Sequence, residues 1–392
     1  MYLALGQVLM LSRLPWLERL VGFDRLTVWH RRNGKACILL VLAHVVLITI
    51  GYALSDQISI PSEYSRLLSS YPGMVTATVG TVLMVIVVAS SLIIVRRRLP
   101  YEGWYAVHLT VYGGIVLSYL HQIPTGNEFT TNPAQKDYWI GLYVAVLALL
   151  LAFRVARPLR RALRHRLRVE SVTPEGPGVV SVRVTGRQLD RLGGRAGQFF
   201  VWRFLTPGRW WQAHPFSLSS VPDGSVLRLT VKSVGGFSGG LADLRPGTRV
   251  LAEGPFGTFT ADRRHHRRVA LIAGGIGITP LRALFEELEA APGELALIYR
   301  AISEDDFVLR EELRELARTR GAELHFIAGD HREPGAEQLL SPEHLLELVG
   351  DLPQREVFLC GPPAMMSATR ASLLRAGVPS RQIHTERFAL AL

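Results

Sequence analysis

The most constraining feature of the sequence is the uneven distribution of its apolar residues. Residues 1–155 hold nearly all the long apolar runs, whereas the rest mixes short apolar runs with Gly, Pro and charged residues. Crossing the hydrocarbon core of a bilayer takes about 20 mainly apolar residues. Four segments reach that length, at 36–54, 73–95, 104–123 and 138–156. The sequence therefore predicts an α-helical transmembrane bundle of four full spans, followed by a soluble half.

The N-terminal segment is apolar but too short to cross a bilayer. Residues 1–12 are interrupted by "RLPWLER" at 13–19. The segment lacks a basic beginning and a small-residue cleavage site, so it does not read as a cleavable signal peptide. We expect residues 1–24 to be a partial apolar segment ahead of a bundle formed by residues 25–157.

Basic residues next to the apolar runs predict the orientation of the spans. The net charge is +11, and much of the excess lies in "RVARPLRRALRHRLR" at 154–168. Arginines at this position attract an anionic inner leaflet and fix topology, so we expect membrane lipid rather than nucleic acid as the partner. The loops with a single basic residue, Arg66 and Lys136, are then external. We expect a multi-pass protein of the plasma (inner) membrane, with its C-terminal half cytoplasmic.

Four histidines lie within or beside the predicted spans, where an ionisable group indicates a functional site. His30 and His44 belong to the first span, and His108 and His121 to the third. The two separations, of fourteen and thirteen residues, correspond to about 21 and 20 Å of helix. Because both spans run from inside to outside, His30 should lie level with His108, and His44 with His121. Two levels of facing imidazoles are what two stacked b-type haems require.

A structural role is the alternative for these histidines, since a single intramembrane histidine often forms a hydrogen bond between helices. Two pairs with nearly equal spacing are harder to explain in that way. One detail fits poorly: a fourteen-residue step keeps His30 and His44 on one helix face, but a thirteen-residue step separates His108 from His121 by about 140°. Either the third span is overwound near Gly113 and Gly114, or the two haems are rotated relative to each other.

The soluble half changes in pattern near residue 263. Before it, short β-rich runs such as "VVSVRVTG" and "VLRLTVKSV" are separated by turn residues, which predicts an antiparallel β-barrel over residues 158–262. After it, strand-like and helix-like segments alternate. That alternation predicts an α/β domain over residues 263–392, with a parallel sheet covered by helices on both faces.

Two motifs in this half have the residues of nucleotide sites. "AGGIGITPLRALFEEL" at 273–288 follows a predicted strand and opens a helix, and Gly275 and Gly277 allow the backbone to approach a pyrophosphate. Thr279 suits an N-cap and Pro280 the first helical position. "HPFSLSS" at 214–220 could place Phe216 against a flavin ring and Ser217 on a ring nitrogen, although a plain strand would read similarly.

The ordered set of motifs resembles a known family. HPFS, GGFS, EGPFG, GGIGITP, CGPP and a C-terminal ERF occur in the order typical of the ferredoxin-reductase-type flavin and NAD(P) module. With the paired histidines ahead of them, residues 25–388 resemble the ferric reductase and NADPH oxidase superfamily. The family usually has six spans, so either the bundle tolerates fewer or the N-terminus is truncated. The chain also continues four residues beyond the ERF motif.

The resemblance implies a role for each matching residue. His214, Pro215, Phe216 and Ser217 would hold the FAD isoalloxazine, with Gly236 and Ser238 near its phosphates. Gly275, Gly277 and Thr279 would bind the pyrophosphate of the nicotinamide nucleotide. Cys360 and Gly361 would lie by the nicotinamide, and Phe388 would cover the flavin. Arg300 ends the second strand of the α/β domain, where a cation favours the 2′-phosphate of NADPH.

These features predict an NAD(P)H-dependent flavohaem oxidoreductase. Electrons would pass from NADPH through FAD and two b-type haems, ligated by His30/His108 and His44/His121, to an external acceptor, either a ferric chelate or dioxygen. No residue is expected to act as a catalytic acid, base or nucleophile. The alternatives are a membrane-tethered NAD(P)H-flavin reductase with a cytoplasmic acceptor and structural histidines, and a haem-binding sensor that does not turn over.

Overall fold

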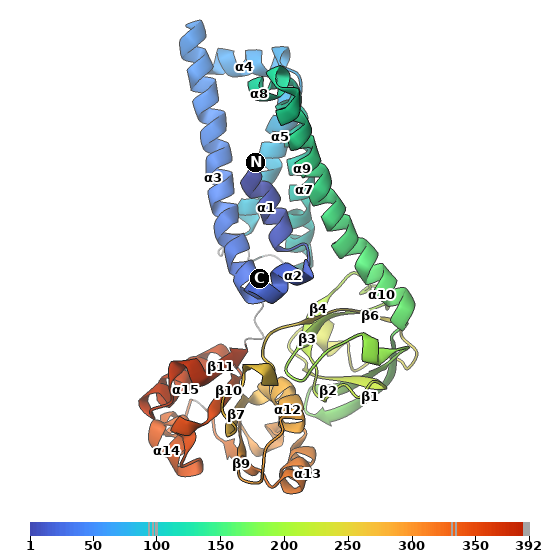
Figure 1. The fold of residues 1–392 in the computed structure, drawn as a ribbon, viewed down its shortest axis with the longest axis vertical. Coiled ribbons are helices and arrows are strands. Elements are labelled where there is room, and N and C mark those ends of the chain that lie inside the picture. The colour runs from blue at the N-terminus through green and yellow to red at the C-terminus, as the bar shows by residue number, and fades with distance from the viewer. Residues whose placement is uncertain (93–94, 96–97, 99–100, 331, 334, 387–392) are drawn as a thin grey trace. The chain divides into compact units, whose positions relative to one another are not determined.

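A computed structural model describes residues 1–386 except 93–94, 96–97, 99–100, 331 and 334. The chain divides into two compact units, Met1–Arg157 and Pro158–Leu392. The first is built from helices and the second contains all the described strands (Figure 1).

The helices of the first unit follow the apolar runs of the sequence. They are α1 (Tyr2–Met10), α2 (Pro15–Val21), α3 (Phe23–Asp56), α4 (Ile60–Ser70), α5 (Met74–Ser90), α7 (Tyr101–Thr125), α8 (Asn127–Thr131) and α9 (Pro133–Leu151). A π-helical segment, Ala152–Ala156, continues α9 into α10 (Arg157–His165). Local sequence signals set two of the helix starts. Ser59 caps α4 by accepting from the Ser62 amide, and Asn132 caps α9 ahead of Pro133.

The predicted membrane spans are only partly reproduced. Two helical stretches, Arg25–Asp56 and Pro133–His165, are long and apolar enough to cross a membrane, and a third arises if α4 and α5, bent by 114°, form one span. These numbers concern the described residues. The helix α7 falls short because tyrosine, glycine and histidine residues lower its mean hydropathy, and α5 alone has 17 residues. Four full spans therefore remain a prediction.

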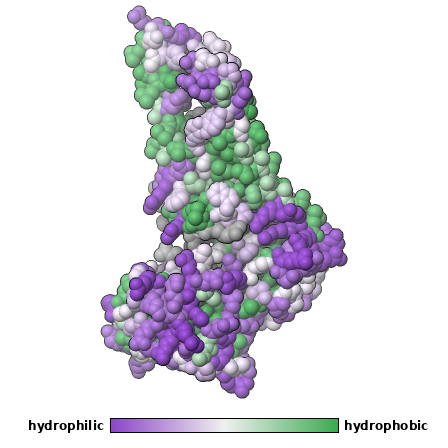
Figure 2. Space-filling model, viewed as in Figure 1, coloured by the Kyte–Doolittle hydropathy of each residue, from purple (hydrophilic) through white to green (hydrophobic). Residues whose placement is uncertain are grey.

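The surface of the helical unit is apolar. Large side chains on α3 are exposed, among them Leu39, Leu47 and Leu54. Figure 2 shows hydrophobic residues over much of this unit, whereas hydrophilic residues dominate the visible face of the second unit. Such an extensive exposed apolar surface is typical of protein that faces lipid.

Close packing of glycines joins α5 to α7. A Cβ at Gly80 would lie 2.6 Å from the Gly114 carbonyl oxygen, and a Cβ at Gly114 would lie 2.9 Å from the Gly80 carbonyl oxygen. Glycine is required here because the two backbones approach closely, as in other membrane helix pairs with small residues at the interface. The helix α7 is α-helical throughout Tyr101–Thr125, so overwinding near Gly113 and Gly114, one of the two explanations considered for the histidine spacing, is not observed.

The N-terminal part of the second unit contains two three-stranded antiparallel sheets. One sheet has the order β1-β2-β5 and the other β4-β3-β6. The strands are β1 (Arg168–Gly176), β2 (Val179–Thr185), β3 (Phe199–Phe204), β4 (His214–Ser217), β5 (Val226–Lys232) and β6 (Val250–Phe256). The two sheets share one apolar core, to which Val182 and Leu229 contribute from one sheet and Phe200 and Trp202 from the other.

This arrangement meets the expected β-barrel only in part. The strands and their antiparallel pairing are as predicted. At the β1–β6 edge the two sheets are joined by the Arg168–Arg249 bridge and by backbone hydrogen bonds, among them Val169 N–H to the Thr248 carbonyl oxygen at 2.9 Å, but within the described residues not by a full ladder. A continuous barrel requires a hydrogen-bonded ladder at every edge. We therefore describe this region as two packed sheets.

The C-terminal part of the second unit is a five-stranded parallel sheet of order β11-β10-β7-β8-β9. Its elements are β7 (Val269–Gly274), α12 (Ile278–Glu287), β8 (Leu295–Ala301), α13 (Arg310–Arg320), β9 (Glu323–Ala328), α14 (Pro342–Leu348), β10 (Glu356–Cys360), α15 (Pro363–Arg375) and β11 (Ile383–Glu386). Alternate residues of β7 face opposite sides. Leu271 packs with α12 and α13, whereas Ile272 packs with α14 and α15. The prediction of a parallel sheet covered on both faces is confirmed.

Candidate functional site

The nucleotide motifs meet where the order of the parallel sheet reverses. The strands β7 and β10 are adjacent in the sheet but are separated by β8 and β9 in the chain. In open α/β sheets, ligands bind at the carboxyl ends of the strands at such a switch point. Gly275 and Gly277 follow β7, and Cys360 and Gly361 lie at the end of β10. The topology therefore brings the GGIG and CGPP motifs to one edge of the sheet.

Two glycines of the GGIG motif differ in what surrounds them. Gly275 has φ +51°, and a Cβ there would have nothing within 4 Å, so its backbone faces open space. A Cβ at Gly277 would lie 2.3 Å from the Cys360 carbonyl oxygen. Gly277 thus allows close packing against the CGPP motif, while Gly275 leaves room for a ligand to reach the backbone.

The predicted N-cap at Thr279 is wrong. The helix α12 begins at Ile278 with Gly277 as its N-cap, because a 3₁₀ turn at Gly275–Gly277 already brings the backbone into helical conformation. The Thr279 hydroxyl donates to the Ile276 carbonyl oxygen at 3.1 Å. Pro280 consequently lies deeper in the first turn than expected, where its missing N–H is still tolerated.

Cys360 and Arg300 lie at the carboxyl ends of β10 and β8, the two strands that flank β7. Cys360 is fully buried, and burial raises the pKa of its thiol. Arg300 lies at the end of β8, paired in register with Gly274, and its Nη2 donates to the Gly329 carbonyl oxygen at 3.2 Å. Partial burial lowers the pKa of Arg300, and the negative charge of Asp330 offsets part of that change. Arg300 is thus a cation at the edge of the sheet where a nucleotide would lie.

The HPFS motif forms β4 and contributes to an aromatic stack. The His214 and Phe237 rings are stacked with centroids 4.0 Å apart, and Phe216 lies nearly parallel to Phe237 at 6.2 Å. Pro215 pairs with Val201 of β3, and the indole N–H of Trp202 donates to the Phe216 carbonyl oxygen at 3.0 Å. The strand is therefore held from β3, and its aromatic side chains are aligned by Phe237. Such a face of parallel rings suits a planar heterocycle.

The GGFS motif forms the single helical turn α11 (Gly236–Gly239). The Ser238 hydroxyl oxygen accepts from the Val234 amide at 2.9 Å, and a Cβ at Gly236 would have nothing within 4 Å. Ser217 at the end of β4 is buried. The turn thus places Gly236 and Ser238 on either side of Phe237, which stacks on the HPFS strand.

In the helical unit, the structure brings His30 and His108 together. Their ring centroids are 6.0 Å apart at an interplanar angle of 52°. A metal–imidazole bond is about 2 Å long, so two imidazoles on opposite sides of one ion have centroids roughly 6 Å apart. His30 Nδ1 lies 3.2 Å from the Gln7 carbonyl oxygen, which leaves Nε2 for a ligand.

His44 and His121 form the second predicted pair. His44 is among the electrostatic neighbours of His121. The backbone of α7 at His121 packs against Gly73, where a Cβ would lie 2.8 Å from the His121 Cα. Ring Nδ1 of His108 is buried and has no hydrogen-bond partner among the described residues, whereas His121 has a backbone hydrogen bond with Ser118. Buried orphan imidazole nitrogens are unusual without a ligand or water.

The facing imidazoles of His30 and His108 are an arrangement that could hold a haem. No cluster of three or more His, Cys, Asp or Glu side chains suitable for a metal occurs in the part of the chain that the structure describes. A haem needs only two protein ligands because the porphyrin supplies the other four. The predicted flavin-covering residue, Phe388, lies outside the described residues.

Two residues that contribute to these sites were missed at the sequence level. Phe237 is the residue of the GGFS motif for which the sequence predicted no role. Its position between Gly236 and Ser238, both predicted to lie near the FAD phosphates, could have suggested that it contributes to the flavin site. Gln7 lies in the N-terminal helix α1. Its side-chain amide donates to the His30 carbonyl oxygen at 2.7 Å and its Oε1 accepts from Asn33. No sequence pattern signals that contact, because it depends on how α1 packs against α3.

Comparison with known proteins gives family matches in both halves of the chain. Residues 1–119 match the family described as ferric reductase like transmembrane component, and residues 271–371 match the oxidoreductase NAD-binding domain. Ferredoxin–NADP reductase B of Sorangium cellulosum is 36% identical over 188 residues, which are 44% of this chain and 77% of that protein. The heavy chain of a superoxide-generating NADPH oxidase from Dictyostelium discoideum is 25% identical over 323 residues. The chain belongs to the ferric reductase and NADPH oxidase superfamily.

The match to the Dictyostelium protein covers 73% of this chain but only 58% of that relative. Among solved structures, the Amycolatopsis cytochrome P450 reductase is 25% identical, with a TM-score of 0.48, over 57% of this chain and 69% of that one. As a member of the superfamily, the chain is a membrane protein whose C-terminal half is an oxidoreductase module of the ferredoxin-reductase type.

Proposed function

We propose that the protein carries electrons across a membrane, from NADPH through FAD and two b-type haems to an external acceptor. The observation that carries the proposal is the facing pair His30 and His108 in a chain that also contains a flavin and nucleotide module. A chain that only reduced a cytoplasmic acceptor would have no need of paired imidazoles in its N-terminal helices.

For the cytoplasmic reaction, the described residues would bind and align two planar groups. The stack of His214, Phe216 and Phe237 suits the FAD isoalloxazine, and Gly236 and Ser238 suit its phosphates. The Gly275 backbone suits the pyrophosphate of NADPH, with Arg300 near the 2′-phosphate. FAD, when bound, supplies the conversion of a two-electron hydride into single electrons. No side chain of the site is required as an acid or base.

For the membrane part, His30 with His108 and His44 with His121 would each hold one haem. The Gln7 carbonyl oxygen would accept a hydrogen bond from the His30 Nδ1–H and so fix the tautomer that leaves Nε2 for iron. Haem supplies one-electron redox chemistry at a potential set by its ligands and surroundings. We place the protein in the plasma (inner) membrane with the C-terminal half cytoplasmic, on the basis of the basic residues at 154–168.

The two candidate acceptors, a ferric chelate and dioxygen, are proposed from the redox chemistry of haem rather than from a binding pocket. Reduction of a ferric chelate or of dioxygen at a haem edge needs no dedicated binding site. The relative from Dictyostelium, by its name, generates superoxide, and the first family matched is that of ferric reductases. Supplying ferric chelate or oxygen singly to the purified protein, while NADPH loss is followed, separates the two acceptors.

The deciding experiment is a reduced-minus-oxidised absorption spectrum with haem-to-protein stoichiometry. We expect two haems and one FAD per chain, and reduction of both haems by NADPH under anaerobic conditions. A chain that oxidises NADPH without any haem spectrum would instead be a membrane-tethered flavin reductase. A chain that holds haem, FAD and NADPH but turns over with no acceptor would be a sensor.

A further inference from the structure

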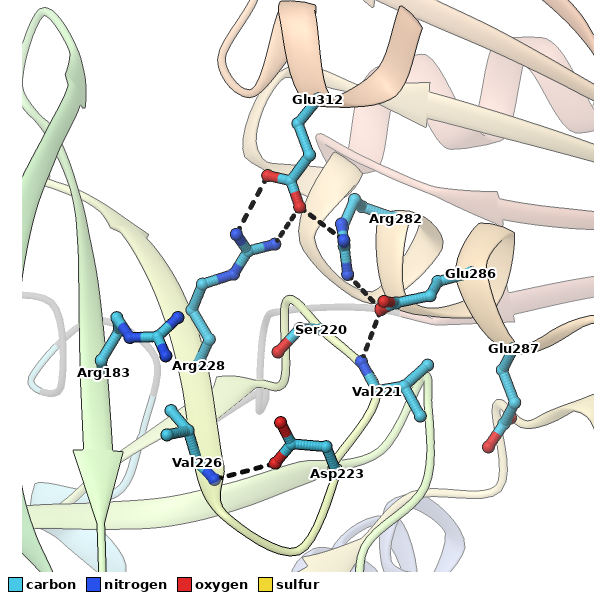
Figure 3. Close-up of a pocket in the computed structure, with 10 residues that line it drawn as sticks. All are labelled: Arg183, Ser220, Val221, Asp223, Val226, Arg228, Arg282, Glu286, Glu287 and Glu312. Carbon is cyan, nitrogen blue, oxygen red and sulfur yellow. Dashed lines mark hydrogen bonds and ion pairs between the residues drawn. The ribbon is translucent and has the colours of Figure 1, made fainter. Parts of the chain in front are cut away.

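A network of charged side chains connects the two parts of the second unit. Arg228 of β5 forms a bidentate ion pair with Glu312 of α13, with both N–O distances 2.9 Å (Figure 3). Bidentate arginine–carboxylate pairs fix orientation as well as distance. On the β-sheet side, Arg228 Nη2 also donates to the Ser219 carbonyl oxygen at 2.8 Å. One guanidinium thus joins the segment after β4 to a helix of the α/β part.

Arg282 of α12 extends the network. It is ion-paired with both Glu312 and Glu286, and Figure 3 shows its guanidinium between the two carboxylates. The Glu286 carboxylate in turn accepts from the Val221 amide at 2.8 Å. We refer to Arg228, Arg282, Glu286 and Glu312 as the interdomain network. It returns to the β-sheet part at Val221, two residues beyond the Ser219 contact.

The network is buried enough to constrain geometry. Only 6% of the Arg282 side chain and 13% of the Arg228 side chain are exposed. Arginines this deep must stay paired, because an unpaired buried charge is costly. A cavity of about 550 Å³ borders the network and is lined mainly by charged and polar groups. Charge pairing thus acts here beside the apolar contacts that Val179 and Val221 make with the core around α12.

The elements that the network joins are those of the proposed cofactor sites. Ser219 and Val221 follow directly after the HPFS strand, which ends at Ser217. Arg282 and Glu286 lie on α12, whose N-terminal end follows the GGIG motif. A shift of α12 relative to the segment at 219–221 would therefore displace the nucleotide motif from the flavin motif.

We propose that the interdomain network positions the nicotinamide nucleotide against the flavin by holding α12 to the segment that follows β4. This inference rests on the proposed binding of FAD and NADPH. In the reaction it serves, the C4–H bond of NADPH breaks, and the hydride with its electron pair adds to N5 of FAD, giving NADP⁺ and the reduced flavin anion. Such a transfer is sensitive to distance, so an error of about 1 Å costs roughly a hundredfold in rate.

The test compares Glu312→Gln and Arg282→Lys with Glu315→Gln in the full chain. Glu315 lies on the same helix as Glu312 but pairs with Arg318 on the exposed surface, so its variant controls for loss of a carboxylate. Arg282→Lys keeps the buried positive charge, but one ammonium cannot reproduce the two-armed contact with Glu286 and Glu312. If Glu312→Gln fails to fold, Arg282→Lys alone provides the test.

Two readouts are needed, and the first does not depend on redox activity. Without nucleotide, peptides covering 218–222 should exchange amide hydrogen at least about tenfold faster in Glu312→Gln and Arg282→Lys than in wild type or Glu315→Gln. In anaerobic stopped-flow, saturating NADPH should reduce bound FAD roughly ten- to a hundredfold more slowly in the network variants, at unchanged FAD content.

Wild-type exchange at 218–222, or wild-type FAD reduction, in both network variants would overturn the proposal. Because the kinetic readout ends at the flavin, failure of electron transfer to the haems or to an external acceptor does not affect it. A wild-type chain whose FAD is not reduced by NADPH would refute the proposed function, and the exchange comparison would still decide whether the network holds the two parts together.

Discussion

His30 and His108 face each other across α3 and α7, with ring centroids 6.0 Å apart and ring planes inclined by 52°. They are 78 positions apart in the sequence, and the ring of Trp104 packs against His108 at 5.0 Å. Each imidazole is supported from a different direction, His30 by the Gln7 carbonyl oxygen and His108 by the indole. The pair is therefore placed by three helices.

If each pair of histidines holds one haem, alanine substitutions should act in pairs. His30→Ala should lower the haem content from two to one per chain, and His30→Ala combined with His108→Ala should lower it no further, since both remove the same site. His30→Ala combined with His44→Ala should remove both haems. Pyridine-haemochrome stoichiometry of purified variants provides the measurement. Two haems retained in all single variants would assign the histidines a structural role.

The two glycines of the GGIG motif should fail in different ways. In Gly275→Ala the added Cβ has free space, and the φ of +51° costs about 1–2 kcal/mol, so the chain should still fold. The KM for NADPH should rise, because the Cβ occupies the space through which a ligand would reach the backbone. Gly277→Ala would drive its Cβ against the Cys360 backbone. It should therefore lower the melting temperature of the second unit strongly. An unchanged KM in Gly275→Ala would argue against a nucleotide at that turn.

Phe237 should be required for flavin retention. It is buried and stacks on His214 and Phe216, so Phe237→Ala should cost about 3–5 kcal/mol of unfolding free energy and should release FAD during gel filtration. Phe237→Leu preserves most of the volume and serves as the comparison. The flavin-to-protein absorbance ratio measures the effect. Equal FAD content in the alanine variant and the wild type would contradict the proposed flavin face.

Glu287 should make stability depend on pH. Burial raises the pKa of this carboxyl above its usual 4.5. A backbone hydrogen bond from Ala196 and the positive charge of Arg195 lower the pKa, but by less than burial raises it. Because the folded protein binds this proton more tightly than the unfolded chain, the stabilising effect of protonation is full below the unfolded pKa. It is lost as pH rises through the folded pKa.

We therefore expect Glu287→Gln to melt at a higher temperature than wild type at pH 7. The difference should shrink as the pH is lowered towards 4. The exposed neighbour Glu289→Gln is the control. Differential scanning fluorimetry across that range gives the comparison, and a constant difference at all pH values would exclude titration of Glu287 as its origin.

The sequence alone determined the local structure of both halves. Long apolar runs predicted helices at α3, α5, α7 and α9, and the alternation after residue 263 predicted the parallel sheet, because side-chain periodicity follows directly from local backbone geometry. The helical rise also predicted His30 level with His108. The same reasoning placed the N-cap of α12 two residues too late, because a 3₁₀ turn and an α-helix leave nearly the same sequence signal.

Only the tertiary structure decided which distant residues meet. Gly277 packs on Cys360 because β10 returns to lie beside β7, and Arg228 reaches Glu312 across 84 positions because two parts of one unit pack together. Gln7 supports His30 because α1 docks on α3. Local preferences are set by each residue and its near neighbours, whereas contacts at long separation depend on the free energy of packing whole elements, which no short pattern encodes.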